Sequence, residues 1–380
     1  MTEEKTASKY PDIRGCEREN QFPPISLFSK IPDAPCDSTG GVEAPDARYV
    51  SAELRELTLK SQDSRNLDQL PFVLGWAEDG KLVIENLAEM RHVLVGGCVS
   101  AEITGCLNSL LTGLLLSRTP DEMRLILIGA DSGVLQAYKH TGHLAMPFIT
   151  NAKEAGSGLR WAITEMERRW HLFKNEKVRD INGYNALVGN DAGPVRLPYI
   201  VIVVDELAEL MGVAKQEIES YIVRLASLSR GSGIHMVLAT QRPTVGVVTG
   251  TIKSHIPGRI AFRVAHGNDS RTILDTLGAE NLPGKGDMLY LPFGKNKPIR
   301  LQGAWINPEL IRRVTDWLRT QRAPEFLHEI GPEVETSLDM EPSGDTTEIS
   351  SNNNGSGLVM PFLFPGIFRN IVNRATPPPT

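Results

Sequence analysis

The chain has 380 residues, 41% of them hydrophobic, which is enough for one large domain with appendages or for two domains. Its net charge of -6 excludes a surface that attracts nucleic acid as a whole, so any DNA contact must come from a local basic patch. No apolar run reaches the roughly 18 residues of a membrane span, and the start of the chain does not resemble a signal peptide. The four cysteines show no metal-binding spacing. We therefore expect a cytoplasmic protein, with Cys98 and Cys106 as free thiols in the core.

The patterns along the chain divide it into four parts. Residues 1–50 are rich in Pro, Gly, Asp and Glu, and we expect a loose or disordered lead. Residues 51–91 form a small N-terminal β/helical portion, where two apolar runs flank Glu78-Asp79-Gly80 and predict a hairpin. Residues 92–323 form the main domain. Residues 324–380 form a flexible tail with a short apolar segment at 358–372.

Strands and helices are expected to alternate between residues 92 and 323. The strand patterns lie at 92–95, 124–128, 199–204, 234–239, 259–264, 287–291 and 299–304. The helix patterns lie at 103–116, at 157–177, around 218–228, and from Pro308, behind its cap Asn307, to about 321. This alternation predicts an α/β fold with a parallel or mixed central sheet flanked by helices.

The helix expected at 157–177 is amphipathic. Its apolar residues are predicted to face inward: Ile163, Met166, Trp170 and Phe173. Its charged residues are predicted to form a solvated face: Glu165, Glu167, Arg168 and Arg169.

Two adjacent carboxylates, Asp205 and Glu206, follow six consecutive β-forming residues at 199–204. So continuous an apolar run predicts a strand buried on both faces, and the carboxyl end of such a strand is where open α/β sheets bind ligands. In phosphate-transfer sites the first carboxylate of such a pair holds Mg²⁺, and the second orients the attacking water. The alternative is a strand that simply ends in a solvated acidic turn.

A phosphate-binding loop of the pattern G-x-x-x-x-G-K-S/T is expected after an earlier strand. The corresponding segment runs from Gly97 to Thr104, and it has Glu102 in place of the second glycine and Ile103 in place of the lysine. An ion pair at about 4 Å is worth roughly 4 kcal/mol at an effective dielectric near 20. Losing the lysine and adding a carboxylate therefore predicts a large loss of ATP affinity, although Thr104 could still reach Mg²⁺ together with Asp205.

Residues 92–306 resemble the motor domain of the FtsK/SpoIIIE family of DNA translocases. The resemblance rests on motifs such as Ala239-Thr240-Gln241-Arg242-Pro243 and Val204-Asp205-Glu206-Leu207, in order and correctly spaced. Further matching stretches lie at 106–111, 119–128, 159–169, 181–185, 249–253, 259–262, 269–275 and 284–289. The resemblance implies a RecA-like P-loop NTPase fold that assembles as a ring, typically a hexamer, around double-stranded DNA and uses ATP and Mg²⁺.

The resemblance also implies roles for individual residues. Asp205 and Glu206 match the Walker B pair, and Gln241 matches the sensor of the γ-phosphate. The residues at nucleotide-loop positions are Gly97, Ser100, Glu102, Ile103 and Thr104, with Thr104 and Asp205 as the Mg²⁺ ligands. The candidates for an arginine that reaches a neighbouring subunit's nucleotide are Arg259 and Arg271, whose alternative role is structural pairing. The basic segments 242–253 and 263–271 are the expected DNA contacts.

Two departures from the family pattern leave several functions open. Besides the altered loop, the chain has Gly129-Ala130-Asp131 where the family has Asp-Pro-Lys. One interpretation is a ring subunit that has lost ATP binding, in a homo-oligomer or together with an active paralogue. Another is an active translocase in which Ser100, Thr104 and backbone amides, or Lys253 or Lys285, compensate for the missing lysine. A third is an unrelated metal-dependent phosphohydrolase.

Overall fold

The computed structural model describes residues 24, 69–130, 133–187 and 195–328. In this part of the chain nine strands form one sheet in the order β2-β1-β9-β8-β7-β3-β6-β5-β4. The strands are β1 (Pro71–Ala77), β2 (Leu82–Asn86), β3 (His92–Gly96), β4 (Met123–Ile128), β5 (Tyr199–Val204), β6 (Ile234–Thr240), β7 (Gly258–Ala261), β8 (Asp287–Leu291) and β9 (Ile299–Gly303).

The sheet has a parallel half and an antiparallel half. Strands β7, β3, β6, β5 and β4 pair in parallel. Strands β8, β9, β1 and β2 extend the sheet through antiparallel pairs. The expected mixed α/β sheet and the hairpin at 71–86 are confirmed. The hairpin belongs to the same sheet as β3, so the boundary predicted at residue 91 falls within one sheet.

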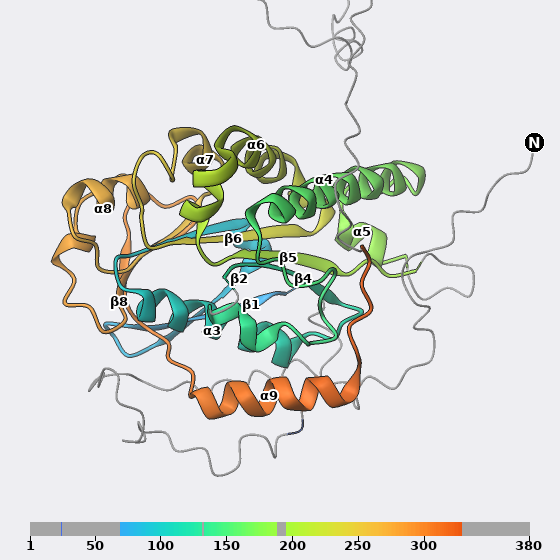
Figure 1. Ribbon diagram of the computed structural model, residues 1–380, viewed down its shortest axis with the longest axis horizontal. Coiled ribbons are helices and arrows are strands. Elements are labelled where there is room, and N and C mark those ends of the chain that lie inside the picture. The colour runs from blue at the N-terminus through green and yellow to red at the C-terminus, as the bar shows by residue number, and fades with distance from the viewer. Residues whose placement is uncertain (1–23, 25–68, 131–132, 188–194, 329–380) are drawn as a thin grey trace, which may run out of the picture. The chain divides into compact units, whose positions relative to one another are not determined.

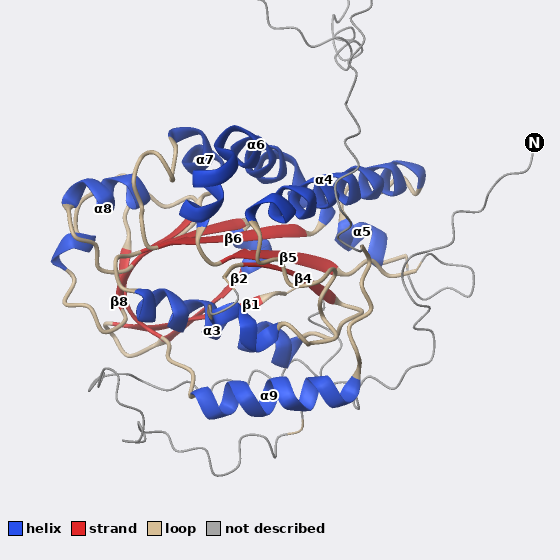
Figure 2. Ribbon diagram, in the orientation of Figure 1, coloured by secondary structure: helices blue, strands red, loops and turns tan. Residues whose placement is uncertain are grey.

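Helices cover both faces of the sheet (Figures 1 and 2). The α-helices are α2 (Leu87–Met90), α3 (Ser100–Ser117), α4 (Ala152–Asn175), α5 (Ile181–Asn185), α6 (Leu207–Leu228), α7 (Gly250–His255), α8 (Gly267–Leu274) and α9 (Pro308–Gln321). The 3-10 helices are η4 (Val134–Tyr138), η5 (Ser229–Ser232) and η6 (Ala279–Asn281). Helices α4, α6 and α7 lie on one face, and α3 lies on the other with α9 packed outside it. Separate apolar clusters fill the two sides of the sheet.

The six β-forming residues of β5 favour a strand that is buried on both faces. All six residues of β5 are buried, and β4 and β6 pair with its two edges. Because Asp205 follows Val204 directly, the strand delivers the acidic pair to the edge of the sheet where the parallel strands end.

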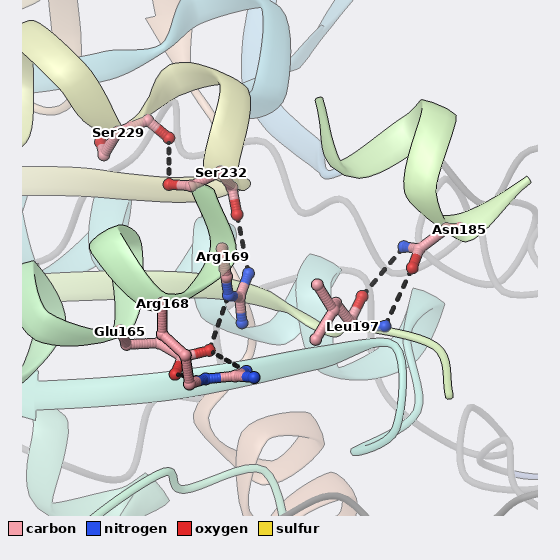
Figure 3. Close-up of polar contacts among 7 residues, drawn as sticks. All are labelled: Glu165, Arg168, Arg169, Asn185, Leu197, Ser229 and Ser232. Carbon is pink, nitrogen blue, oxygen red and sulfur yellow. Dashed lines mark hydrogen bonds and ion pairs between the residues drawn. The ribbon is translucent and has the colours of Figure 1, made fainter. Parts of the chain in front are cut away.

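The solvated face predicted for the helix around 157–177 is wrong at two residues. Glu165 and Arg169 are 6% and 0% exposed, because α4 packs against α6 and the turn η5. In Figure 3 the Arg169 side chain reaches from Glu165 to the backbone of Ser232. Trp170, predicted to face inward, is instead 39% exposed. Glu165 and Arg169 therefore lie in the contact of α4 with α6 and η5, where apolar side chains were expected.

Other expectations meet the structure in part. Cys106 is buried, but Cys98 is exposed, so its predicted place in the core is wrong. Among the described helices none is both long and apolar enough to cross a membrane. The predicted lead at 1–50 lies outside the described residues except for residue 24. The apolar segment at 358–372 lies outside them entirely.

Candidate functional site

A pocket of about 710 Å³ lies where β3, β4, β5 and β6 end. The described residues that line it come from the segments after these four strands: Ser100, Thr104, Ala130, Gly133, Val134, Asp205, Glu206, Ala208, Glu209, Gln241 and Arg242. The structure therefore brings together the predicted Asp205, Glu206 and Gln241 with the hydroxyls of Ser100 and Thr104. This is the edge of an open α/β sheet where ligands bind.

The Glu206 carboxylate is held by three hydrogen bonds. The Thr240 hydroxyl and the backbone amide of Gln241 donate to it at 2.5 and 2.9 Å. The backbone amide of Ala208 donates at 3.1 Å, which makes Glu206 the N-cap of α6. Strand β6 and helix α6 thus fix one orientation of the carboxylate.

Gln241 connects two sides of the pocket. Its side-chain amide lies 3.2 Å from the hydroxyl of Ser100, so the residue after β6 contacts the first residue of α3.

Asp205 carries the clearest electrostatic signature of the pocket. Burial, together with the negative charges of Glu206 and Glu209, raises its pKa to about 6. The backbone at Gly129 and Gly133 lies close to it, because a Cβ on Gly133 would lie 2.7 Å from its Oδ2 and one on Gly129 would lie 2.9 Å from its Cβ. The raised pKa thus reflects a carboxyl group that is partly buried beside two other acids.

We expect Asp205→Asn to raise the free energy of unfolding at pH 7–8 in metal-free buffer. The folded-state pKa of about 6 lies above the ordinary 3.8, so native stability falls as pH rises from about 4 to about 6. The full shift corresponds to about 3 kcal/mol, and partial exposure reduces the expected gain to about 1–2 kcal/mol. Urea unfolding from pH 4 to 8 checks this, with the exposed Glu154→Gln as control. An equal pH slope in native and variant proteins would contradict it.

The oxygen donors in the pocket suit Mg²⁺, but they are too few to coordinate the ion without water or ligand oxygens. Thr104 and Asp205, a hydroxyl and a carboxylate, line the same pocket, and hard oxygen donors are those that Mg²⁺ prefers. Within residues 69–130, 133–187 and 195–328 no group of three His, Cys, Asp or Glu side chains lies close enough to hold a metal alone. Mg²⁺ here would depend on water and on phosphate oxygens, as it does in nucleotide sites.

The segment at the expected phosphate-loop positions, from Gly97 to Thr104, lines the pocket only through Ser100 and Thr104. Helix α3 already begins at Ser100, and neither Glu102 nor Ile103 lines the pocket. Ile103 is 2% exposed and belongs to the core on the α3 side of the sheet. Glu102 is 5% exposed, and burial raises the pKa of its carboxyl. Both side chains therefore lie away from the pocket.

The predicted arginines differ in their surroundings. Arg259 is bonded to Asp275 and to the backbone carbonyls of Lys253, Ile256 and Ile273, as structural pairing requires. Lys253 forms an ion pair with the same Asp275, at 2.6 Å. Arg271 is exposed on α8. None of the three lines the pocket, and neither does Lys285.

Reasoning from the sequence did not assign Glu209, Thr240 or Arg242 to this site. Glu209 lines the pocket from the first turn of α6, Arg242 lines it just after Gln241, and Thr240, which does not line it, donates to Glu206. Arg242, expected among the DNA contacts, is the only lysine or arginine among the described residues lining the pocket. Its position next to Gln241 was the signal that could have placed it there.

The family model that matches this chain describes the FtsK/SpoIIIE family and covers residues 53–245. The DNA translocase FtsK of Clostridium acetobutylicum is 41% identical over 83% of this chain and 41% of its own length. The DNA translocase SpoIIIE of Bacillus subtilis is 40% identical over 81% of this chain and 40% of its own length. The chain thus spans about two fifths of these relatives.

Two solved structures share the fold. The conjugation coupling protein TcpA of pCW3 has a TM-score of 0.56 at 24% identity, covering 67% of this chain and 73% of that one. The cytoplasmic domain of the type VII secretion ATPase EccC of Thermomonospora curvata has a TM-score of 0.59 at 22% identity, covering 70% of this chain and 32% of that one. The sheet, the pocket at its edge and the match over half of the sequence lead to one conclusion: the chain belongs to the FtsK/SpoIIIE family.

Proposed function

We propose that this chain is a DNA-translocase-type subunit of a cytoplasmic ring around double-stranded DNA, and that its own nucleotide site binds MgATP weakly or not at all. Family membership and the relatives named DNA translocase support the motor type. In this proposal the chain contributes a RecA-like scaffold to a ring, hexameric as in the resemblance, made of identical subunits or shared with an active paralogue.

The loss of ATP binding is supported by one observation above all. The two residues at the loop positions for glycine and lysine, Glu102 and Ile103, are buried and absent from the pocket lining. Among the described lining residues, three carboxylates, Asp205, Glu206 and Glu209, stand against the cation Arg242. A triphosphate would meet more negative than positive charge there, which weakens its binding. Family membership leaves an unrelated phosphohydrolase without support.

The second candidate is an active translocase with a compensated loop. Arg242 supports it, because this exposed side chain lines the pocket and could supply the missing positive charge. The contact of Gln241 with Ser100 places Arg242 next to a residue that already touches the loop region. Arg242 is the better candidate for compensation than Lys253, which is paired with Asp275.

Calorimetric titration of MgATP into the purified chain separates the two candidates. We expect no binding by the native chain at concentrations up to about 1 mM, which corresponds to a binding free energy weaker than about -4 kcal/mol. Micromolar binding that Arg242→Ala abolishes would instead establish the compensated motor. Arg224→Ala is the matched control, because Arg224 is exposed and pairs with Glu167 outside the pocket. Absence of salt-sensitive duplex binding by the assembled protein would contradict a translocase-type role altogether.

A further inference from the structure

Glu102 is a buried acid on the first turn of a helix, where acids are normally exposed. Ser100 and Thr104 are four residues apart, share one face of α3, and line the pocket. Glu102 lies between them in sequence and therefore on the opposite face, away from the pocket. A buried carboxylate needs a polar partner. A nucleotide in the pocket could not be that partner, because Glu102 lies on the other face of α3.

The turn 284–286, which precedes β8, supplies one such partner, and Arg263 lies close to the same carboxylate. The backbone amide of Gly286 donates to Glu102 Oε1 at 3.0 Å, across 184 residues of chain. Gly284, Lys285 and Gly286 all have positive φ, at 88°, 60° and 86°. Successive residues in unusual turn conformations aim backbone N–H groups at an anion, and here the anion is the protein's own carboxylate.

The turn is itself firmly attached to the sheet. Gly303 of β9 donates from its backbone amide to the carbonyl of Gly286 at 2.7 Å. The side-chain amide of Gln302 donates to the carbonyl of Lys285 at 2.9 Å. Glu102 therefore connects the start of α3 to a turn that is itself hydrogen-bonded to β9.

The loop before α3 is held from the same side. The backbone amide of Cys98 donates to the carbonyl of Arg263 at 2.8 Å, and a Cβ on Gly97 would lie 2.9 Å from Cβ of Phe262. Between these contacts and Glu102 the chain turns directly into helix at Ser100. A loop that enclosed a phosphate would need residues 98–102 to leave this arrangement.

We propose that Glu102 and the turn 284–286 form an internal latch that keeps the first turn of α3 helical and the loop before it closed. Glu102 stands at the position of the second glycine of the loop motif. In the latch it has a structural role in addition to replacing that glycine. Glu102 is thus a positioning residue, which acts on Ser100 and Thr104 through the helix. The inference deepens the proposed function, since it names the contact that keeps the loop from receiving phosphate.

Amide hydrogen exchange of the full chain tests the latch without any nucleotide. We expect Glu102→Ala to speed exchange at least tenfold both in the peptide around 98–104 and in the peptide around 284–288. Glu102→Gln, which retains an acceptor oxygen at the same reach, should leave both close to native. The matched control is Glu154→Ala, because Glu154 is also the third residue of a long helix but is exposed.

Glu102→Asp supplies a second variant in case Glu102→Ala does not fold. It keeps the charge but withdraws the carboxylate by one methylene, so exchange should rise in both peptides above the level of Glu102→Gln. Unchanged exchange in the Ala and Asp variants, or a rise confined to the α3 peptide, would overturn the latch. Micromolar MgATP binding by the native chain would overturn the proposed function while leaving these exchange rates as they are, so the two failures are distinguishable.

Discussion

Glu165→Gln is expected to lower the free energy of unfolding at pH 7 by about 3–5 kcal/mol, because it removes the negative charge that pairs with the buried guanidinium of Arg169. Arg169 is fully buried, and its Nε donates to Glu165 Oε1 at 2.8 Å. Its Nη1 donates to the backbone carbonyl of Ser232 at 2.8 Å, which joins α4 to the turn between α6 and β6. Figure 3 shows this chain of contacts.

The pH dependence of stability gives the same ion pair a second signature. Burial opposes ionisation of Glu165, but the guanidinium groups of Arg169 and Arg168 outweigh it and hold its pKa at about 2, below the ordinary 4.5. The carboxylate's contribution to stability is therefore complete above about pH 4.5 and is lost as the pH falls towards 2. In Glu165→Gln this part of the acid-induced loss should be missing.

Urea unfolding of the native and variant chains between pH 2.5 and 7 measures both effects. Glu167→Gln is the matched control, because Glu167 lies on the same helix and pairs with Arg224, but both side chains are about half exposed. Exposed pairs contribute about 0–1 kcal/mol, so this control should remain near native stability. A Glu165→Gln variant as stable as the control would show that Arg169 does not need its partner.

The burial of Glu165 and Arg169 could not be predicted from the sequence. Charged residues spaced like Glu165 and Arg169 are usual on a solvated helix face, and nothing local distinguishes a pair that packs against another element. The burial depends on η5, which is some 60 residues away in the sequence. The ring of Trp170 also lies against Gly231 of that turn, although the side chain is 39% exposed.

The candidate site was easier to predict where strands decide it. The continuous apolar run of β5 placed Asp205 and Glu206 at the correct edge, and β6 brought Gln241 beside them. The positions of Glu102 and Arg242 were not predictable in this way. The partner of Glu102 is a turn that follows it by 184 residues, and the place of Arg242 depends on a loop conformation. Local patterns establish the framework, whereas long-range contacts decide which side chains face the pocket.

Ile103→Lys alone is expected to destabilise the fold by about 3 kcal/mol or more and to bind no MgATP. Ile103 is 2% exposed within the apolar core, so the new ammonium group would be buried without a partner. The substitution restores the lysine of the loop motif in sequence, but the helical start at Ser100 directs it into the core. Ile103→Met, of similar volume, should cost less than about 1.5 kcal/mol.

Adding Glu102→Gly should change this result more than the two single effects predict. The glycine removes the contact with Gly286 and weakens the first helical turn by about 1 kcal/mol, which allows the introduced lysine to leave the core and reach the pocket. With MgATP at about 100 times its Kd, binding would return about 2.7 kcal/mol of stability. We therefore expect the double variant in MgATP to be at least about 1 kcal/mol more stable than the sum of the single effects.

Urea unfolding of the native chain, the two single variants and the double variant, with and without MgATP, measures this coupling. Additive effects without MgATP binding would mean that the missing lysine and glycine are not what closes the site. The acidic pocket formed by Asp205, Glu206 and Glu209 would then itself exclude the nucleotide, because its negative charge repels the phosphates whatever the loop before α3 does.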